Sequence, residues 1–244
     1  MQIIIIVGIL LLSIISGMLG LGVAFSAIPF LSFFYHDLVN QVQPLALLLN
    51  GITAIFSAFG FARSGYIKWK EALILSIITT IFAPVGAFLV YYVKQIYIWI
   101  IYLISVIYLT YRLWKPVKKE ETQKENFVLV LILAIPISIL SGFLGVGPGF
   151  LLMPTLIING FDAKFAAGIN AFAVTFPSFS ALVPHLKTAN IDMKMLVILL
   201  ITGAAGSFFG ARMTSKFIKS ENLKRIFGIL IVIMTIYKIW TMIK

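Results

Sequence analysis

Two uncharged runs constrain this chain more than any other feature. Residues 2–35 and residues 127–161 contain no Asp, Glu, Lys, Arg or His. A straight helix over the 34 residues of the first run would be about 50 Å long, whereas the hydrocarbon core of a bilayer is about 30 Å thick. Each run must therefore be interrupted. In the first run we expect two half-helices, at about 3–16 and 23–35.

Glycines mark the interruption, and they recur 125 positions later. The repeated positions are Ser16, Gly17, Leu19, Gly20, Gly22, Phe25, Pro29 and Leu31, which match Ser141, Gly142, Leu144, Gly145, Gly147, Phe150, Pro154 and Leu156. Glycine disfavours helix and lets a backbone or a ligand approach closely, and Pro148 strengthens the second break. Glycine-rich breaks at matching places in two halves are the best sequence pointer to the binding site of a secondary transporter.

The composition agrees with a membrane protein. Of the 244 residues, 61% are hydrophobic and 11% are charged, with a mean hydropathy of +1.08, whereas a soluble domain has about a quarter charged residues. Nineteen Lys and Arg against eight Asp and Glu give a net charge of +11. In a membrane protein we interpret this excess as a topology signal and not as a nucleic-acid surface. The absence of cysteine excludes disulfides and thiol chemistry, and the first run lacks the basic start and cleavage site of a signal peptide.

We therefore predict an all-α polytopic membrane protein made of two homologous halves, residues 1–114 and 127–244, joined by a charged cytoplasmic linker at 115–126. Each half would contain one broken or re-entrant hairpin and three transmembrane helices, giving seven or eight membrane segments. The expected helices cover 42–62, 72–93, 96–111, 165–184, 195–211 and 222–243.

The basic residues distinguish two layouts of the broken runs. If each run crosses the membrane fully, Lys and Arg divide 12 against 7 between the two sides; if each run returns to its own side, they divide 14 against 5. The re-entrant layout obeys the positive-inside rule better. It also gives each half an odd number of crossings and thus inverted repeats, which we prefer over parallel repeats.

Apart from Lys224 and Arg225 at the start of the last one, the predicted spans contain no charged residue except Lys238, which we expect to extend its ammonium group to the membrane surface. What remains is polar neutral side chains and the N-termini of the half-helices, whose free N–H groups can bind an anion without a buried cation. Asn170 aligns with Asn50 when the repeat offset changes by five. The candidate substrate-binding residues are Gly20, Gly22, Val23, Asn50, Thr53, Gly145, Gly147, Gly149, Asn170, Thr175 and Ser178.

Each of these residues also has a purely structural interpretation. Glycines in membrane helices pack helices together, as we expect for Gly206 and Gly210. Hydroxyl side chains bond back to their own helix. His185 is expected at the membrane interface, and Asp37 and Asp162 are expected to cap the helices that follow them. We predict no metal and no cofactor.

At the breaks the sequence resembles the TauE/SafE family of sulfite-exporter-like permeases. The family pattern is a G-x-G-G-G run followed by proline in each half. Here it reads Gly20-Leu21-Gly22-Val23-Ala24 with Pro29, and Gly145-Val146-Gly147-Pro148-Gly149 with Pro154. Two motif positions in the first copy and one in the second depart from glycine. The resemblance implies transport of sulfite, sulfonates or related anions, coupled to an ion gradient, in a bacterial or archaeal plasma membrane.

The expected function is thus a secondary transporter for a small anion, with an anion channel of the same fold as the alternative. An intramembrane enzyme would need a Ser–His pair, paired acids or a metal cluster within the bilayer, and the predicted spans offer none. The expected partners are the anion, a coupling ion (H⁺ or Na⁺) and the lipid bilayer, with no nucleic acid. The chain is expected to be a monomer or a homodimer.

Overall fold

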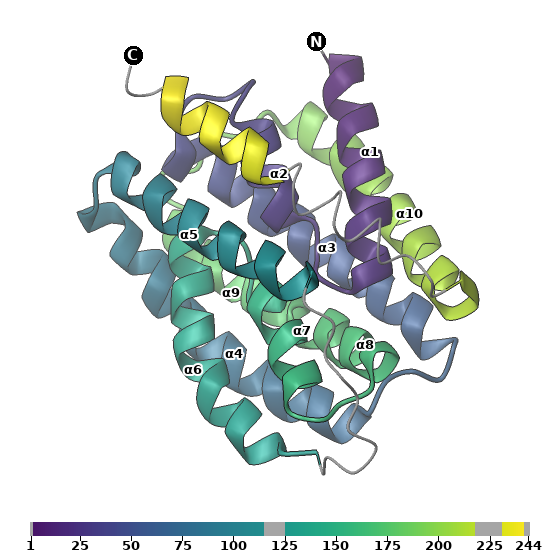
Figure 1. The fold of residues 1–244 in the computed structure, drawn as a ribbon. Helices are drawn as coiled ribbons and strands as arrows, with labels where there is room; N and C mark the ends of the chain where they lie inside the picture. The colour runs from purple at the N-terminus through teal and green to yellow at the C-terminus, as the bar shows by residue number, and fades with distance from the viewer. Residues whose placement is uncertain (1, 115–124, 218–230, 242–244) are drawn as a thin grey trace.

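The computed structural model describes residues 2–114, 125–217 and 231–241, and these residues form helices joined by short turns (Figure 1). The first half contains α1 (Gln2–Leu19), α2 (Ala24–Leu31), η1 (Leu38–Val42), α3 (Gln43–Ala62), α4 (Trp69–Leu89), η2 (Val90–Tyr92) and α5 (Gln95–Trp114). The second half contains α6 (Phe127–Leu144), α7 (Gly149–Ile158), α8 (Ala163–Ala173), α9 (Thr175–Leu182), η3 (Val183–His185) and α10 (Met193–Phe217), followed by a last helix at Ile231–Thr241. Most of the predicted linker, residues 115–124, lies outside the described residues.

Six segments of the described chain are long and apolar enough to cross a membrane. They are Gln2–Leu19, Leu38–Ala62, Trp69–Tyr92, Phe127–Leu144, Ala163–His185 and Met193–Met213. The prediction of an all-α polytopic membrane protein is therefore confirmed.

Each uncharged run folds back on itself as a hairpin. The backbone N–H of Asn126 donates to the carbonyl of Asn159 over 3.0 Å, which joins the start of α6 to the end of α7. In the first run, the ring of Phe30 lies against Gly8, and the hydroxyls of Ser16 and Ser26 are 3.5 Å apart. Both ends of each run therefore lie at the same end of the molecule.

The two arms of each hairpin are unequal, which differs from the predicted half-helices at 3–16 and 23–35. The helix α1 has 18 residues and α2 has 8, while α6 has 18 and α7 has 10. Gly17 does not end α1, because it is a packing residue whose missing side chain admits the backbone of Ser207. The helix continues to Leu19 and ends at the next glycine.

The first helix of each half packs against the other half: α1 lies along α10, and α6 lies along α4. A Cβ added at Gly210 would overlap the backbone of Ile14, and one added at Gly86 would overlap that of Ile139, the matching residue of the other repeat. Likewise, Gly142 meets Ala83 as Gly17 meets Ser207. The packing expected for Gly206 and Gly210 is confirmed, because both lie against α1.

The helix directions follow from individual contacts. The helix α3 is antiparallel to α8 and α9, because Asn50 contacts Ser178 while Tyr66, just beyond α3, contacts Lys164. The same helix is parallel to α10, because Thr53 contacts Ser207 while Gly60 contacts Ala211.

These directions place basic residues at both ends of the bundle. Arg63, Lys68, Lys70, Lys164 and Arg212 lie at the end where α3 and α10 finish, whereas Lys94, Lys187 and Lys194 lie at the opposite end.

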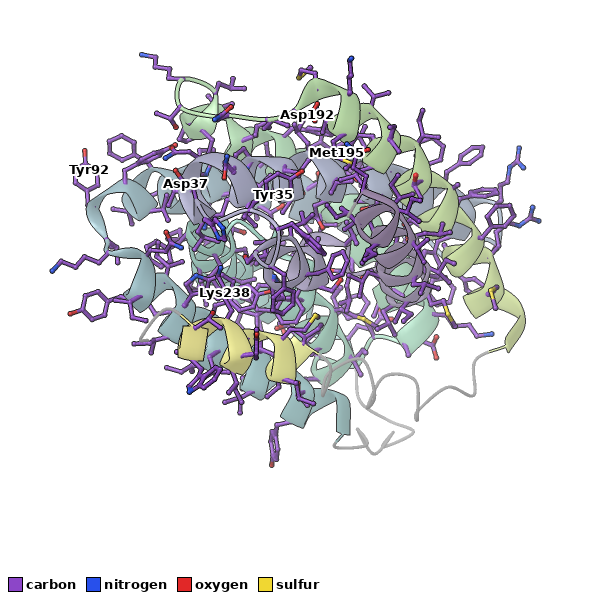
Figure 2. All side chains as sticks on the ribbon, turned by 90° about the horizontal axis from the view of Figure 1, so that it is seen from above. Tyr35, Asp37, Tyr92, Asp192, Met195 and Lys238 are labelled. Atoms are coloured by element: carbon purple, nitrogen blue, oxygen red, sulfur yellow. The ribbon has the colours of Figure 1, made fainter. Side chains whose placement is uncertain are left out.

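One expectation about a polar residue was wrong. Lys238 does not extend to the surface: its side chain points inward from the last helix (Figure 2), is 8% exposed and donates to the carbonyl of Ser32 over 2.7 Å. The carbonyls at the end of α2 attract the ammonium group. His185 is the last residue of the apolar segment Ala163–His185, and its side chain is fully buried within the protein, with Nδ1 lying 3.0 Å from the carbonyl of Val39 and 3.0 Å from the hydroxyl of Tyr91.

The two predicted caps are confirmed. Asp37 Oδ1 accepts from the backbone N–H groups of Val39 and Asn40 at the start of η1. Asp162 Oδ1 accepts from the N–H of Lys164 at the start of α8 over 2.9 Å.

Candidate functional site

The two breaks have the same backbone geometry. Gly20 and Gly145 end α1 and α6 with φ of 63° and 71°, and Gly22 and Gly147 follow with φ of 75° and 71°. These left-handed conformations cost little only for glycine, which explains why the glycines repeat. The hydrogen bonds repeat too: the N–H of Leu21 donates to Ser16, and that of Val146 donates to Ser141.

Both breaks lie inside the protein. All residues at 19–29 and at 144–150 are buried, so α2 and α7 begin at a protein interior away from lipid. At membrane depth, non-helical backbone occurs only where it is buried in protein or lines a water-filled cavity, and both breaks meet the first condition.

Asn50 joins the two breaks. Its Oδ1 accepts from the N–H of Ala24 at the start of α2 over 3.0 Å, and its Nδ2 donates to Ser178 Oγ over 2.8 Å. A Cβ added at Gly22 or at Gly147 would overlap the amide of Asn50. One side chain of α3 is therefore in contact with both interruptions, and these two N-terminal ends meet near the centre of the bundle.

Asn170 on α8 also contacts both breaks, but with its other end. Its Nδ2 donates to the carbonyl of Gly20 over 2.6 Å and to that of Gly149 over 3.1 Å, while its buried Oδ1 has no hydrogen-bond partner in the described part of the chain. The two aligned asparagines therefore occupy equivalent places and make opposite contacts.

The other predicted site residues divide into two groups. Val23 is the N-cap of α2, Gly145 packs against the side chain of Gln43, and Ser178 joins the site through Asn50. The hydroxyls of Thr53 and Thr175 instead donate to carbonyls one turn earlier in the chain, those of Asn50 in α3 and of Ala171 near the end of α8, each over 3.2 Å. This is close to the structural role that the sequence left open for them, a bond to a nearby carbonyl of the same chain segment.

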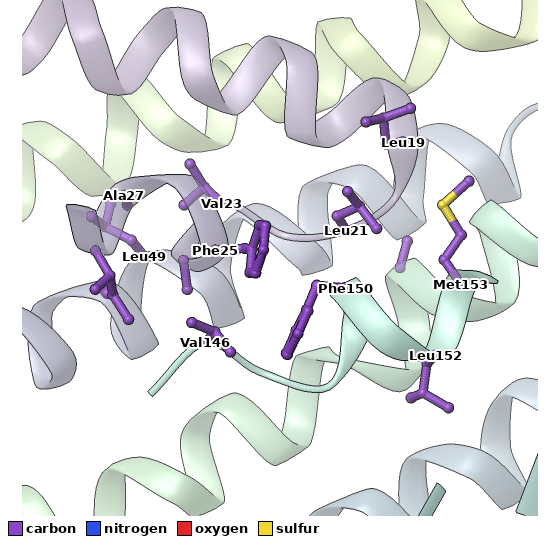
Figure 3. Close-up of a cluster of buried hydrophobic side chains, with 14 of the residues drawn as sticks. Leu19, Leu21, Val23, Phe25, Ala27, Leu49, Val146, Phe150, Leu152 and Met153 are labelled. Carbon is purple, nitrogen blue, oxygen red and sulfur yellow. The ribbon is translucent and has the colours of Figure 1, made fainter. Parts of the chain in front are cut away.

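Sequence reasoning missed an aromatic column beside the breaks. Phe25 and Phe150, at equivalent places in the first turns of α2 and α7, stack with ring centroids 4.7 Å apart (Figure 3). Tyr102 of α5 stacks on Phe25 at 5.7 Å and donates its hydroxyl to the carbonyl of Phe25, and Trp99 packs against Tyr102. The repeat of Phe25 as Phe150 was a usable signal, whereas nothing in the local sequence marks Tyr102.

Gln43 is the second residue that was missed. It is fully buried at the start of α3, and its Nε2 donates to the carbonyl of Phe143 over 3.2 Å, near the end of α6. It thus satisfies a carbonyl that the break leaves unpaired. Its position before a proline at the start of a helix gave no hint of this contact.

The electrostatic character of the site comes from backbone groups. Among the described residues with burial assigned, Lys238 is the one charged side chain that is buried, and it lies at the far end of α2. At the start of α7 the N–H groups of Gly149 and Phe150 donate no hydrogen bond within the described chain. Free amides at a helix N-terminus bind anions.

Paired helix breaks that meet inside a polytopic helical bundle define a class of protein, the membrane transporters. The sequence relationships specify the class further. A family model described as sulfite exporter TauE/SafE matches residues 4–238, so the chain belongs to this family. Its location in a membrane with several spanning helices follows from both findings.

Named relatives agree with this assignment. The chain is 23% identical to a probable membrane transporter protein of Xylella fastidiosa over 237 residues, covering 92% of this chain and 89% of that protein. It is 33% identical to a probable membrane transporter protein of Methanocaldococcus jannaschii over 115 residues, covering 45% of this chain and 43% of that protein. A similar protein of Bacillus subtilis, YdhB, is 32% identical over 97 residues, or 39% of each chain. No solved structure matches the chain.

Proposed function

We propose that this protein is a secondary transporter that moves a small sulfur-containing oxyanion, such as sulfite or an organosulfonate, across the plasma membrane. The observation that carries the proposal is the meeting of the starts of α2 and α7 at Asn50. These ends supply amide donors and a positive dipole in a region where the described residues include no buried acid, which suits a weakly held anion. No catalytic chemistry is needed for this function.

We further propose that the halves are inverted repeats that rock against each other around the breaks. Two features support this arrangement. The helix α3 is antiparallel to its counterpart, the segment α8–α9, and the contact of Gly17 with Ser207 has its equivalent in the contact of Gly142 with Ala83. An inverted pair can exchange its two conformations and thus open the site to either side alternately.

A carrier fits the site better than a channel of the same fold. The breaks are buried, and the stacked rings of Phe25 and Phe150 lie between them. A site enclosed in this way is what alternating access requires between its two open states, whereas a channel needs a continuous path.

The test is flux in proteoliposomes that contain the purified protein. Radiolabelled sulfite should accumulate in response to an imposed H⁺ or Na⁺ gradient and show saturation, without unitary currents in planar bilayers. Currents without coupling would support the channel, and the absence of any sulfite or sulfonate movement would contradict both proposals about the substrate.

A further inference from the structure

The two breaks have the same backbone conformation, but the N–H groups that follow them differ in their hydrogen-bond partners. At the start of α2, the amide oxygen of Asn50 occupies the N–H of Ala24. At the equivalent place, the start of α7, no side-chain oxygen accepts from Gly149 within the described chain, and the N–H of Phe150 is free as well. The N–H of Phe25, the counterpart of Phe150, likewise has no acceptor within the described chain, so the two tips differ at the first N–H of each helix: Asn50 satisfies that of Ala24, whereas that of Gly149 is free.

The side-chain amide of Asn170 lies beside the start of α7 and carries an acceptor as well as donors. Its amide lies directly against Gly149, since a Cβ added at that glycine would be 3.0 Å from Nδ2. The orientation of the amide is fixed by its contacts, because exchanging its two ends would set Oδ1 against the carbonyl oxygens of Gly20 and Gly149. The oxygen that results is fully buried and has no donor among the residues that the structure describes.

A buried acceptor without a donor costs about 1–3 kcal/mol, so such a group in a binding region indicates what its ligand must carry. A fully deprotonated oxyanion would place another acceptor against Oδ1 of Asn170. A bare cation would satisfy Oδ1 but would meet the N–H groups of Gly149 and Phe150 and the positive end of α7. A ligand that satisfies both kinds of group has negative oxygens and one hydroxyl.

We infer that the start of α7, with Asn170, is the anion-binding subsite and that it selects singly protonated oxyanions, whose hydroxyl donates to Asn170 Oδ1 while their charged oxygens accept from Gly149 and Phe150. This inference rests on the proposed transport function and goes beyond it, since it names the half of the molecule that holds the ligand and the protonation state that is recognised.

The experiment compares two monoanions of nearly the same shape, hydrogen sulfite and methanesulfinate, which differ by a hydroxyl in place of a methyl group. Each would be titrated at mildly acidic pH, where hydrogen sulfite is the main species, against uptake of labelled sulfite and against the melting temperature of the detergent-solubilised protein. The wild type should prefer hydrogen sulfite by about tenfold or more, because methanesulfinate leaves Oδ1 unpaired.

Asn170→Leu removes the acceptor, so the ratio of the affinities for hydrogen sulfite and methanesulfinate should fall toward one. Asn40→Leu is the matched control: its Nδ2 also bonds a neighbour, Asp37, and its Oδ1 is also buried and unpaired, but it lies in η1 and away from the breaks. This variant should keep the preference of the wild type.

Equal affinity of the wild type for the two anions would overturn the inference, because Oδ1 would then meet only a resident water. That comparison needs no variant, so it decides the matter even if Asn170→Leu does not fold. If both anions move equally, this inference fails while the proposed transport stands; if neither moves or binds, the proposed function fails as well.

Discussion

At the scale of single residues, the glycines at the breaks combine two separate requirements. Gly147 has a φ of 71°, and a Cβ there would also overlap Asn50. Gly65, in the turn after α3, has a similar φ of 74° but has no atom within 4 Å of an added Cβ. Substitution of Gly65 would therefore test backbone strain alone, whereas substitution of Gly147 would test strain together with displacement of Asn50.

We predict that Gly147→Ala abolishes most transport and lowers stability by more than the strain alone, because it also displaces Asn50. Gly65→Ala should cost only about 1–2 kcal/mol, the penalty for a left-handed non-glycine residue, and should leave flux unchanged. Thermal unfolding in detergent and sulfite flux would be measured for both. Equal effects of the two variants on flux would mean that contact with Asn50 is irrelevant.

Residue patterns allowed part of the site to be predicted. The repeated glycines pointed to the breaks because only glycine adopts their backbone conformation at low cost. The contacts of Asn50 were beyond reach, because it bonds Ser178, which is 128 positions away in the other half. Chemical type alone also could not say that Asn50 presents its oxygen and Asn170 its nitrogen, since that depends on which neighbours each amide meets.

At the scale of elements, the short helix α2 is held by side chains from three other helices. Asn50 of α3 binds its first N–H, Tyr102 of α5 binds the carbonyl of Phe25, and Lys238 of the last helix binds the carbonyl of Ser32. With only 8 residues it is too short to be stable alone, so its position depends on these contacts.

Tyr102→Phe keeps the ring stacked on Phe25 and removes the hydroxyl from the carbonyl of Phe25. We predict a loss of about 1 kcal/mol of stability and a reduced rate of transport, because α2 loses one of its attachments. Tyr108→Phe is the control on the same helix, since Tyr108 is 48% exposed on the outer face. A Tyr102→Phe protein with wild-type melting temperature and flux would contradict this role.

Element boundaries were predicted less well than element types. The break near Gly20 and Gly22 was expected, but the unequal arms were not, because Gly17 was assigned to the break. A glycine that lets two helix backbones touch and a glycine that ends a helix look alike in sequence. The distinction lies in α10, which contacts Gly17 from almost 200 positions away.

At the scale of the whole molecule, the two ends of the bundle carry separate sets of basic residues. The turn after α3 contains Arg63, and the turn after α9 contains Lys187. In an inverted arrangement these equivalent turns face opposite sides of the membrane, with the more basic end in the cytoplasm.

Single cysteines test this in a chain that has none. A membrane-impermeant maleimide should label Lys187→Cys from outside intact cells and Arg63→Cys only after the membrane is opened. Both side chains are exposed, so both cysteines should react fully in detergent. Labelling of both positions from the same side would rule out inverted halves.

The packing of each first helix against the other half has a consequence for biosynthesis. The neighbour of α1 is α10, which the ribosome produces nearly last, whereas α6 emerges after its neighbour α4 already exists. The helix α1 must therefore spend most of translation without its main neighbour, in contact with α2 and α3 of its own half. Neither half alone can complete its own packing, so residues 1–114 or 125–244 produced singly should be degraded, while co-expression of the two fragments should restore a stable complex that co-purifies through a tag on either one.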